Sequence, residues 1–222
     1  MNENRRITIA KRIVQELESG QTVNLGVGIP TLIPDYLDDK QLVLQSENGL
    51  LGMGPTPPPG QVNMDLISAS KDPITMETGA SLFDSSASFA MIRGGHIDVA
   101  VLGALQVDRT GEIANWAVPG ATILGVGGAM DLVAGANKII VATLHSSKHG
   151  EPKLVEELTY PTSGIRKADL VVTEHAVFRF EEGSMYLVEQ LSDLPLDELQ
   201  EITGAPFQVG LREPDKQEEA AE

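Results

Sequence analysis

The sequence predicts an α/β fold: a single domain with a mostly parallel or mixed central sheet covered by helices on both faces. Two observations support this. Residues 97–102 form a continuous apolar run with Asp98 at its start, which is typical of a strand buried on both sides of a sheet, and residues 139–144 are interpreted as another buried strand. Such runs alternate along the chain with segments of helical periodicity, as in strand–helix–strand units. At 222 residues, 41% of them hydrophobic, the chain can bury one large core.

The chain opens with a helix expected over residues 5–19, because five apolar side chains fall on one helical face and Gly20 is a typical stop. They are Ile7, Ala10, Ile13, Val14 and Leu17. A strand at residues 22–25 then enters a turn with Gly26 and Gly28, and a further helix is expected after Pro30. Exposed N–H groups in such a turn suit a phosphate, although a tight turn without a ligand fits the same pattern.

One acid stands at the end of the next apolar strand, residues 42–44. Glu47 is followed directly by Asn48 and Gly49, and we interpret residues 45–55 as a glycine-rich ligand loop. Ligands of α/β proteins usually bind where strands run into loops, and glycines let the backbone approach them closely. A solvated acid in an Asn-Gly turn is the alternative that this pattern leaves open.

A second glycine-rich turn precedes a helix in the middle of the chain. Residues 125–131 read Gly-Val-Gly-Gly-Ala-Met-Asp, and the helix is expected to end near residue 134. Backbone amides at a helix start suit a developing oxyanion, which makes Gly127, Gly128 and Ala129 candidate contacts. Close helix packing permitted by small residues explains the same spacing.

The remaining elements complete the domain. A helix is expected from an N-cap among residues 84–86 to Arg93, and later a strand at 170–173, a β-hairpin at 176–191, a helix at 196–202 and an edge strand at 206–209. The residues between 61 and 82 have no clear pattern except a short strand at 74–76. We place the domain at residues 1–210, and we expect the acidic residues 211–222 to form a disordered tail.

Composition excludes several classes of protein. The net charge of −16, from 32 acidic and 16 basic residues, argues against nucleic acid as a partner. There is no cysteine, no signal-peptide pattern and no apolar run long enough for a membrane span, so a cytoplasmic protein is expected. His145 and His149 are four residues apart, but no glutamate lies between them and a loop is expected there. A metal site is therefore not expected.

Several motifs together resemble one family. Ser46-Glu47-Asn48-Gly49 resembles the signature of the second (B, or beta) subunit of family I coenzyme A transferases. Residues 24–30, 88–98, 114–116 and 127–133 resemble the same family in the same order. The resemblance covers about residues 5–210. It is greatest for the beta chains that act on 3-oxoacids, of the succinyl-CoA:acetoacetate type.

The resemblance implies roles for the candidate residues. Glu47 would be the catalytic nucleophile, forming an acyl-glutamyl anhydride and then a glutamyl-CoA thioester in a double displacement. Gly128 and Ala129 would contact the oxyanion or thioester. The other candidate contacts to substrate or coenzyme A are Gly26, Gly28, Asn48, Gly49 and Gly127. Coenzyme A is carried as a substrate, so no cofactor and no metal are implied.

The resemblance also implies a partner, because in this family the active site lies between the beta subunit and a first (A, or alpha) subunit in a hetero-oligomer. The substrates would be acyl-CoAs and carboxylic acids, and this chain alone would be inactive. The partner would supply positive groups for coenzyme A, since no basic cluster is visible near Glu47. Transfer to 3-oxoadipate, acetate or butyrate remains an alternative, as does a non-catalytic sugar-phosphate-binding relative. We expect structural roles for His96, Asp98 and Asn115.

Overall fold

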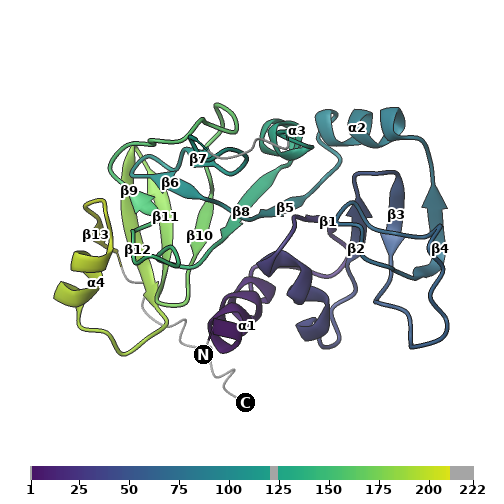
Figure 1. Cartoon of the computed structure of the whole chain (residues 1–222), viewed down its shortest axis with the longest axis horizontal. Coiled ribbons are helices and arrows are strands. Elements are labelled where there is room, and N and C mark those ends of the chain that lie inside the picture. Colours follow the sequence, from purple (N-terminus) through teal and green to yellow (C-terminus); the bar gives the residue numbers. More distant parts are fainter. Residues whose placement is uncertain (1, 121–124, 211–222) are drawn as a thin grey trace, which may run out of the picture.

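A ten-stranded mixed sheet forms the centre of the protein, as Figure 1 shows. The computed structural model describes residues 2–120 and 125–210, so the predicted tail at 211–222 lies outside the described residues. The strands follow the order β13-β12-β11-β10-β8-β5-β1-β2-β3-β4. In chain order they are β1 (Thr22–Leu25), β2 (Val43–Ser46), β3 (Leu50–Met53), β4 (Met76–Leu82), β5 (Val99–Leu102), β8 (Lys138–Ala142), β10 (Leu170–Val172), β11 (Ala176–Glu181), β12 (Ser184–Gln190) and β13 (Gln208–Val209).

The middle of the sheet is parallel. Strands β2, β1, β5, β8 and β10 pair in parallel, whereas β3 and β4 on one side and β11 and β12 on the other pair antiparallel. The predicted hairpin over 176–191 is formed by β11 and β12, and the predicted strand at 206–209 lies at the sheet edge as β13.

Helices cover both faces of the sheet, as predicted. The helices are α1 (Asn2–Val14), the 3-10 helix η1 (Ile29–Tyr36), α2 (Ser85–Arg93), α3 (Ala129–Gly135) and α4 (Leu196–Ile202). Figure 1 shows α2 and α3 on one face and α1 on the opposite face. In the described parts of the chain, no helix is long and apolar enough to pass through a bilayer.

The strands are apolar throughout because they pack against a hydrophobic core on each face of the sheet. In β5, Val99 and Val101 pack in the core under α1, while Ala100 and Leu102 pack in the core under α3. Alternate side chains of a strand point to opposite faces, so a strand covered on both sides must be apolar throughout. In α1, Ile9 and Ile13 have no exposed surface, and burying each contributes roughly 1.5 to 3 kcal/mol.

The first helix ends earlier than predicted. Helix α1 stops at Val14 rather than near residue 19, and Gly20 lies beyond it. The Lys40 ammonium donates hydrogen bonds to the carbonyl oxygens of Val14 (2.7 Å) and Leu17 (2.6 Å). Because a distant side chain satisfies these carbonyls, the helix needs no further turns to do so. Leu17 remains buried in the same core.

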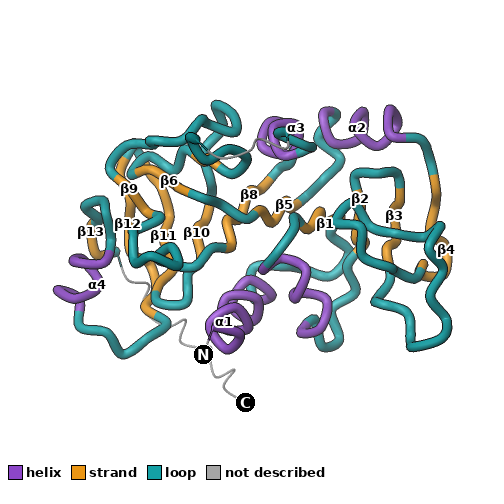
Figure 2. The backbone as a smooth tube through the Cα atoms, viewed as in Figure 1, coloured by secondary structure: helices purple, strands orange, loops and turns teal. Residues whose placement is uncertain are grey.

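The stretch interpreted as a ligand loop is instead a β-hairpin, so the prediction of an open loop over 45–55 is wrong. Strands β2 and β3 pair antiparallel, and Glu47, Asn48 and Gly49 form the turn between them. Figure 2 shows that the long loop comes later, between β3 and β4. Strand β3 was not predicted because the glycines at 52 and 54 interrupt the pattern of apolar side chains that indicates a strand.

A small second sheet was not predicted. It has the order β7-β6-β9, with β6 (Gln106–Asp108), β7 (Ile113–Ala114) and β9 (Leu154–Val155). Strands of two or three residues are too short to show a period in the sequence. The predicted helix at 84–93 is confirmed as α2, and the Asp84 side chain accepts a hydrogen bond from the Ala87 amide (2.8 Å) as its N-cap.

Candidate active site

The sheet reverses its winding direction between β1 and β5. The chain passes from β1 to β2 on one side and later adds β5 on the other side of β1. In open α/β sheets, ligands bind at the carboxyl ends of the strands at such a reversal. A pocket of about 360 Å³ lies at this place, which we call the glycine pocket. Besides Glu47, its lining includes Gly26, Gly103, Asn115, Gly127, Gly128 and Ala129.

Glu47 reaches the pocket from the hairpin turn that follows β2. The Gly49 amide donates to the Ser46 carbonyl oxygen (3.0 Å) and closes the turn. Gly49 has φ +122°, and a Cβ there would collide with the Phe83 carbonyl, so only glycine fits. The tight turn projects Glu47 outward from the sheet, where its side chain is half-buried.

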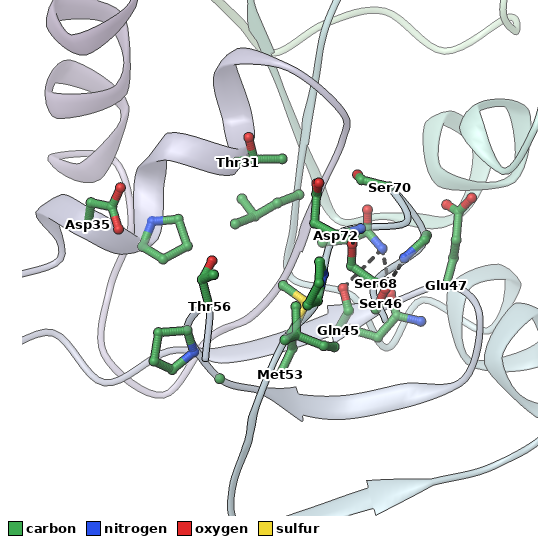
Figure 3. Close-up of a pocket in the computed structure, with 18 residues that line it drawn as sticks. Thr31, Asp35, Gln45, Ser46, Glu47, Met53, Thr56, Ser68, Ser70 and Asp72 are labelled. Atoms are coloured by element: carbon green, nitrogen blue, oxygen red, sulfur yellow. Dashed lines mark hydrogen bonds between the residues drawn. The ribbon is translucent and has the colours of Figure 1, made fainter. Parts of the chain in front are cut away.

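Glu47 also lines a second pocket. It has a volume of about 370 Å³, and we call it the serine pocket. Figure 3 shows Glu47 at one end of it and Asp35 at the other. Its polar lining includes Thr31, Ser46, Thr56, Ser68, Ser70 and Asp72. Glu47 lines both pockets, so the two pockets adjoin at this residue.

Gly128 packs directly against the Glu47 carboxylate. A Cβ built on Gly128 would lie 2.6 Å from Cδ and 2.8 Å from Oε1 of Glu47. Burial raises the pKa of Glu47, and a backbone hydrogen bond from Gly128 acts against that rise. Gly128 immediately precedes α3, so the amide also belongs to the positive end of the helix.

A nearby ion pair also acts on Glu47. The carboxylate of Asp131, in the first turn of α3, contributes to the raised pKa of Glu47 by charge repulsion. Asp131 itself accepts a hydrogen bond of 2.6 Å from the Arg93 guanidinium of α2. This pair ties α3 to α2 and offsets part of the negative charge beside Glu47.

Five of the eight predicted site residues line one pocket. Glu47, Gly26, Gly127, Gly128 and Ala129 all line the glycine pocket. The site therefore places a half-buried carboxylate beside backbone amides, an arrangement suited to nucleophilic attack on a carbonyl group.

The other three predicted contacts, Gly28, Asn48 and Gly49, line neither pocket. The Asn48 amide group donates to the Ile67 carbonyl oxygen (2.8 Å), and the Gly28 carbonyl accepts the Thr31 hydroxyl (2.8 Å) at the start of η1. These positions hold turns and loops in place. Their direct contact with substrate stays a prediction from the resemblance.

The three polar residues expected to be structural separate into two groups. The Asp98 carboxylate accepts the Thr22 amide (2.8 Å) between β1 and β5, and His96 is exposed after α2. Asn115 lines the glycine pocket, where its side-chain oxygen accepts the Ser163 hydroxyl (2.6 Å). Of the three, only Asn115 shares a pocket with Glu47.

A buried polar chain beside the site was missed. The Asn24 amide donates to the Gln45 side-chain oxygen (2.5 Å), and the Gln45 amide donates to the Ser88 hydroxyl (2.8 Å). Asn24 and Gln45 line the serine pocket and are 3% and 1% exposed. The available signal was two amides inside apolar strands, since buried amides require partners.

The histidine pair is not brought together. His149 is exposed, whereas His145 is 1% exposed and lies within hydrogen-bond distance of Thr173 (3.1 Å) and Thr203 (2.9 Å). In the described residues there is no group of three or more His, Asp or Glu side chains that could hold a metal ion.

His145 makes stability depend on pH. Burial, followed by repulsion from His175, lowers the pKa of His145 to about 4. The unfolded chain binds this proton at about pH 6.5, so the histidine favours unfolding as pH falls from 6.5 towards 4. The free energy of unfolding, measured with urea, should fall between pH 7 and pH 4.5 in both proteins. We expect the fall to be about 2 to 3 kcal/mol smaller in His145→Gln than in wild type. An equal loss in both proteins would contradict this assignment.

Comparison with known proteins identifies the family. The pattern of the family described as "Coenzyme A transferase" matches residues 6–193. The B subunit of a succinyl-CoA:3-ketoacid coenzyme A transferase from Helicobacter pylori is 48% identical over 206 residues, covering 93% of this chain and 100% of that protein. The B subunit of a 3-oxoadipate CoA-transferase from Pseudomonas putida is 46% identical over 203 residues, covering 91% and 95%.

A solved structure shares the fold. The acyl-CoA transferase of Escherichia coli O157:H7, in its thioester complex with CoA, superposes with a TM-score of 0.71 at 23% identity. The match covers 92% of this chain and 41% of that one, so this chain spans about two fifths of that enzyme's length. The family pattern and the extended identity to the two bacterial proteins lead to one conclusion: this chain belongs to the coenzyme A transferase family.

Proposed function

We propose that this chain is the beta subunit of a transferase that moves coenzyme A from an acyl-CoA, succinyl-CoA or a similar donor, to a 3-oxoacid such as acetoacetate. One observation supports this proposal most strongly. Glu47 lines both pockets, and its carboxylate lies against the backbone of Gly128 in the glycine pocket. A thioester placed across Glu47 would have its acyl part and its coenzyme A part in separate pockets.

The reaction is a double displacement. A Glu47 oxygen attacks the thioester carbonyl and the C–S bond breaks. The coenzyme A thiolate departs, and an acyl-glutamyl anhydride is formed. The thiolate then attacks the glutamyl carbonyl and expels the first acid as its carboxylate, leaving a glutamyl-CoA thioester. The acceptor acid reverses both steps, so no net proton or electron is consumed.

Positioning provides most of the rate acceleration in this mechanism. Glu47 needs no base to activate it, and holding the thioester against the carboxylate contributes about 7 to 11 kcal/mol. The Gly128 amide would stabilise the tetrahedral oxyanion by on the order of 3 kcal/mol. The raised pKa of Glu47 fits this role, because a poorly solvated carboxylate is a better nucleophile than a fully hydrated one.

An alpha subunit would complete the site. Val27 in the glycine pocket and Met130 beside it are large apolar side chains that are 71% and 46% exposed. A partner chain covering them would exclude water, which otherwise hydrolyses the anhydride. Neither pocket has a Lys, Arg or His in its lining from the described residues, so positive groups for coenzyme A would come from the partner.

Transfer to 3-oxoadipate, acetate or butyrate uses the same steps at Glu47. A second carboxylate, as in succinyl or 3-oxoadipyl groups, would need a cation from the alpha subunit, because neither lining contains one in the described residues. Initial rates of the assembled enzyme with a panel of acids would rank these substrates.

Mass spectrometry of the chain purified with its alpha subunit, after incubation with acetoacetyl-CoA, tests the proposal. We expect a covalent coenzyme A adduct on the peptide that contains Glu47. An adduct with another acyl-CoA from the panel, but not with acetoacetyl-CoA, would correct the substrate. No adduct with any acyl-CoA on an assembled complex would refute the proposed chemistry.

A further inference from the structure

Lys153 is a half-buried charge that forms no ion pair with a described residue, unlike Glu16 and Glu174. Glu16 pairs with Lys138 (2.8 Å) and Arg12 (3.1 Å), and Glu174 lies 3.7 Å from Arg5. Lys153 is half-buried, yet within the described residues no carboxylate lies within 4.0 Å of its ammonium. A desolvated charge without an opposite charge destabilises the folded state, which suggests that Lys153 has a functional role.

The ammonium of Lys153 is bound to the wall of the glycine pocket. It donates to the carbonyl oxygen of Ala104 (3.2 Å) and to the Thr143 hydroxyl (3.1 Å). The Thr143 hydroxyl donates to the same carbonyl (3.0 Å). Ala104 follows β5 and lines the glycine pocket. The lysine therefore stands directly behind one wall of the pocket that contains Glu47.

The small sheet fixes the lysine there. Lys153 immediately precedes β9, and its carbonyl accepts the Val107 amide of β6 (2.8 Å). Burial lowers the pKa of Lys153, and only the more distant Glu174 acts to raise it. A negative charge arriving in the neighbouring pocket would give this ammonium the counter-charge that it lacks.

We propose that Lys153 is a positioning residue of this site: it holds the Ala104 carbonyl in the pocket wall and balances the anion that the reaction brings into the glycine pocket. The inference rests on the proposed transferase function. That function produces two anions beside Glu47, the carboxylate of the acid and the thiolate of released coenzyme A. Among the described residues, the lining of the glycine pocket contains no Lys, Arg or His, and Lys153 bonds to that lining from behind.

Kinetics of Lys153→Met, Lys153→Arg and the control Lys148→Met in the assembled enzyme test this role. Methionine keeps the length of the side chain and removes its charge. We expect Lys153→Met to lose about tenfold to thirtyfold in kcat/KM, and Lys153→Arg to keep most of the wild-type value. An increase in KM for the acid would identify the carboxylate, and slower formation of the Glu47 thioester would identify the thiolate. Lys148 is exposed and lies five residues earlier, so Lys148→Met should keep the wild-type kcat/KM.

Outcomes that oppose the inference are separate from those that oppose the transferase. Unchanged KM and thioester rate in a folded Lys153→Met complex would overturn the role of Lys153, while an adduct on Glu47 would still support the transferase. If the variant does not fold, the pKa of Lys153 can be measured in the wild-type complex by NMR of its 13C-methylated lysines. Saturating acetoacetate probes the carboxylate and saturating coenzyme A probes the thiolate. At least one of them should raise the pKa of Lys153, and an unchanged pKa with both would overturn the inference.

Discussion

Glu47→Gln is expected to lower the turnover of the assembled transferase by at least about 10⁴-fold. The amide keeps the size of the side chain but cannot form the anhydride or the glutamyl-CoA thioester. Stability should not fall, because burial already disfavours the charged carboxylate, as its raised pKa indicates. The measurement is steady-state turnover with acetoacetyl-CoA and succinate, together with the melting temperature of the complex.

Two comparisons make this result specific. Glu198→Gln changes an exposed glutamate on α4, far along the chain from the site, and should keep wild-type turnover. Glu47→Asp keeps the carboxylate but shortens its reach, so it should form the adduct slowly. Turnover of Glu47→Gln within tenfold of wild type would show that Glu47 is not the nucleophile.

The central fold was predictable because its strands are buried on both faces. Val99 to Leu102 had to be apolar at every position, and that continuity is visible without a structure. The hairpin after β2 was not predictable in the same way. Gly52, with φ +84°, sits at a register shift opposite Ala80, and the glycine that permits the bulge also erased the strand pattern.

The candidate site was predictable at Glu47 and Gly128, which stand in recognisable motifs. The motifs do not show how far each residue lies from the pocket in the folded chain. Asn48 and Gly49 follow Glu47 in sequence, yet the Asn48 side chain donates to the Ile67 carbonyl and the Gly49 carbonyl accepts the Phe83 amide, and neither residue lines a pocket. Lys153 lies far from Glu47 in sequence and reaches the pocket wall only because β6 pairs with β9. Such tertiary contacts have no local signature.

Gly128→Ala should reduce turnover by about 10²- to 10³-fold while leaving the fold intact. Gly128 has φ −82° and ψ −1°, a conformation that alanine adopts without strain. The loss would come from the added methyl group, which would lie 2.6 Å from Cδ of Glu47 and so displace the carboxylate. Turnover and melting temperature are measured beside Gly210→Ala, where a Cβ meets Tyr186 at an ordinary 3.5 Å.

A double variant separates this collision from a general defect of the turn. Glu47→Asp withdraws the carboxylate from the space that the methyl group of Gly128→Ala would occupy. We expect the two changes together to cost less than the sum of their separate effects on the activation free energy, since they act on one contact. Strict additivity would mean that the methyl group of Gly128→Ala does not act through the Glu47 carboxylate, and the collision would then not explain the loss of turnover.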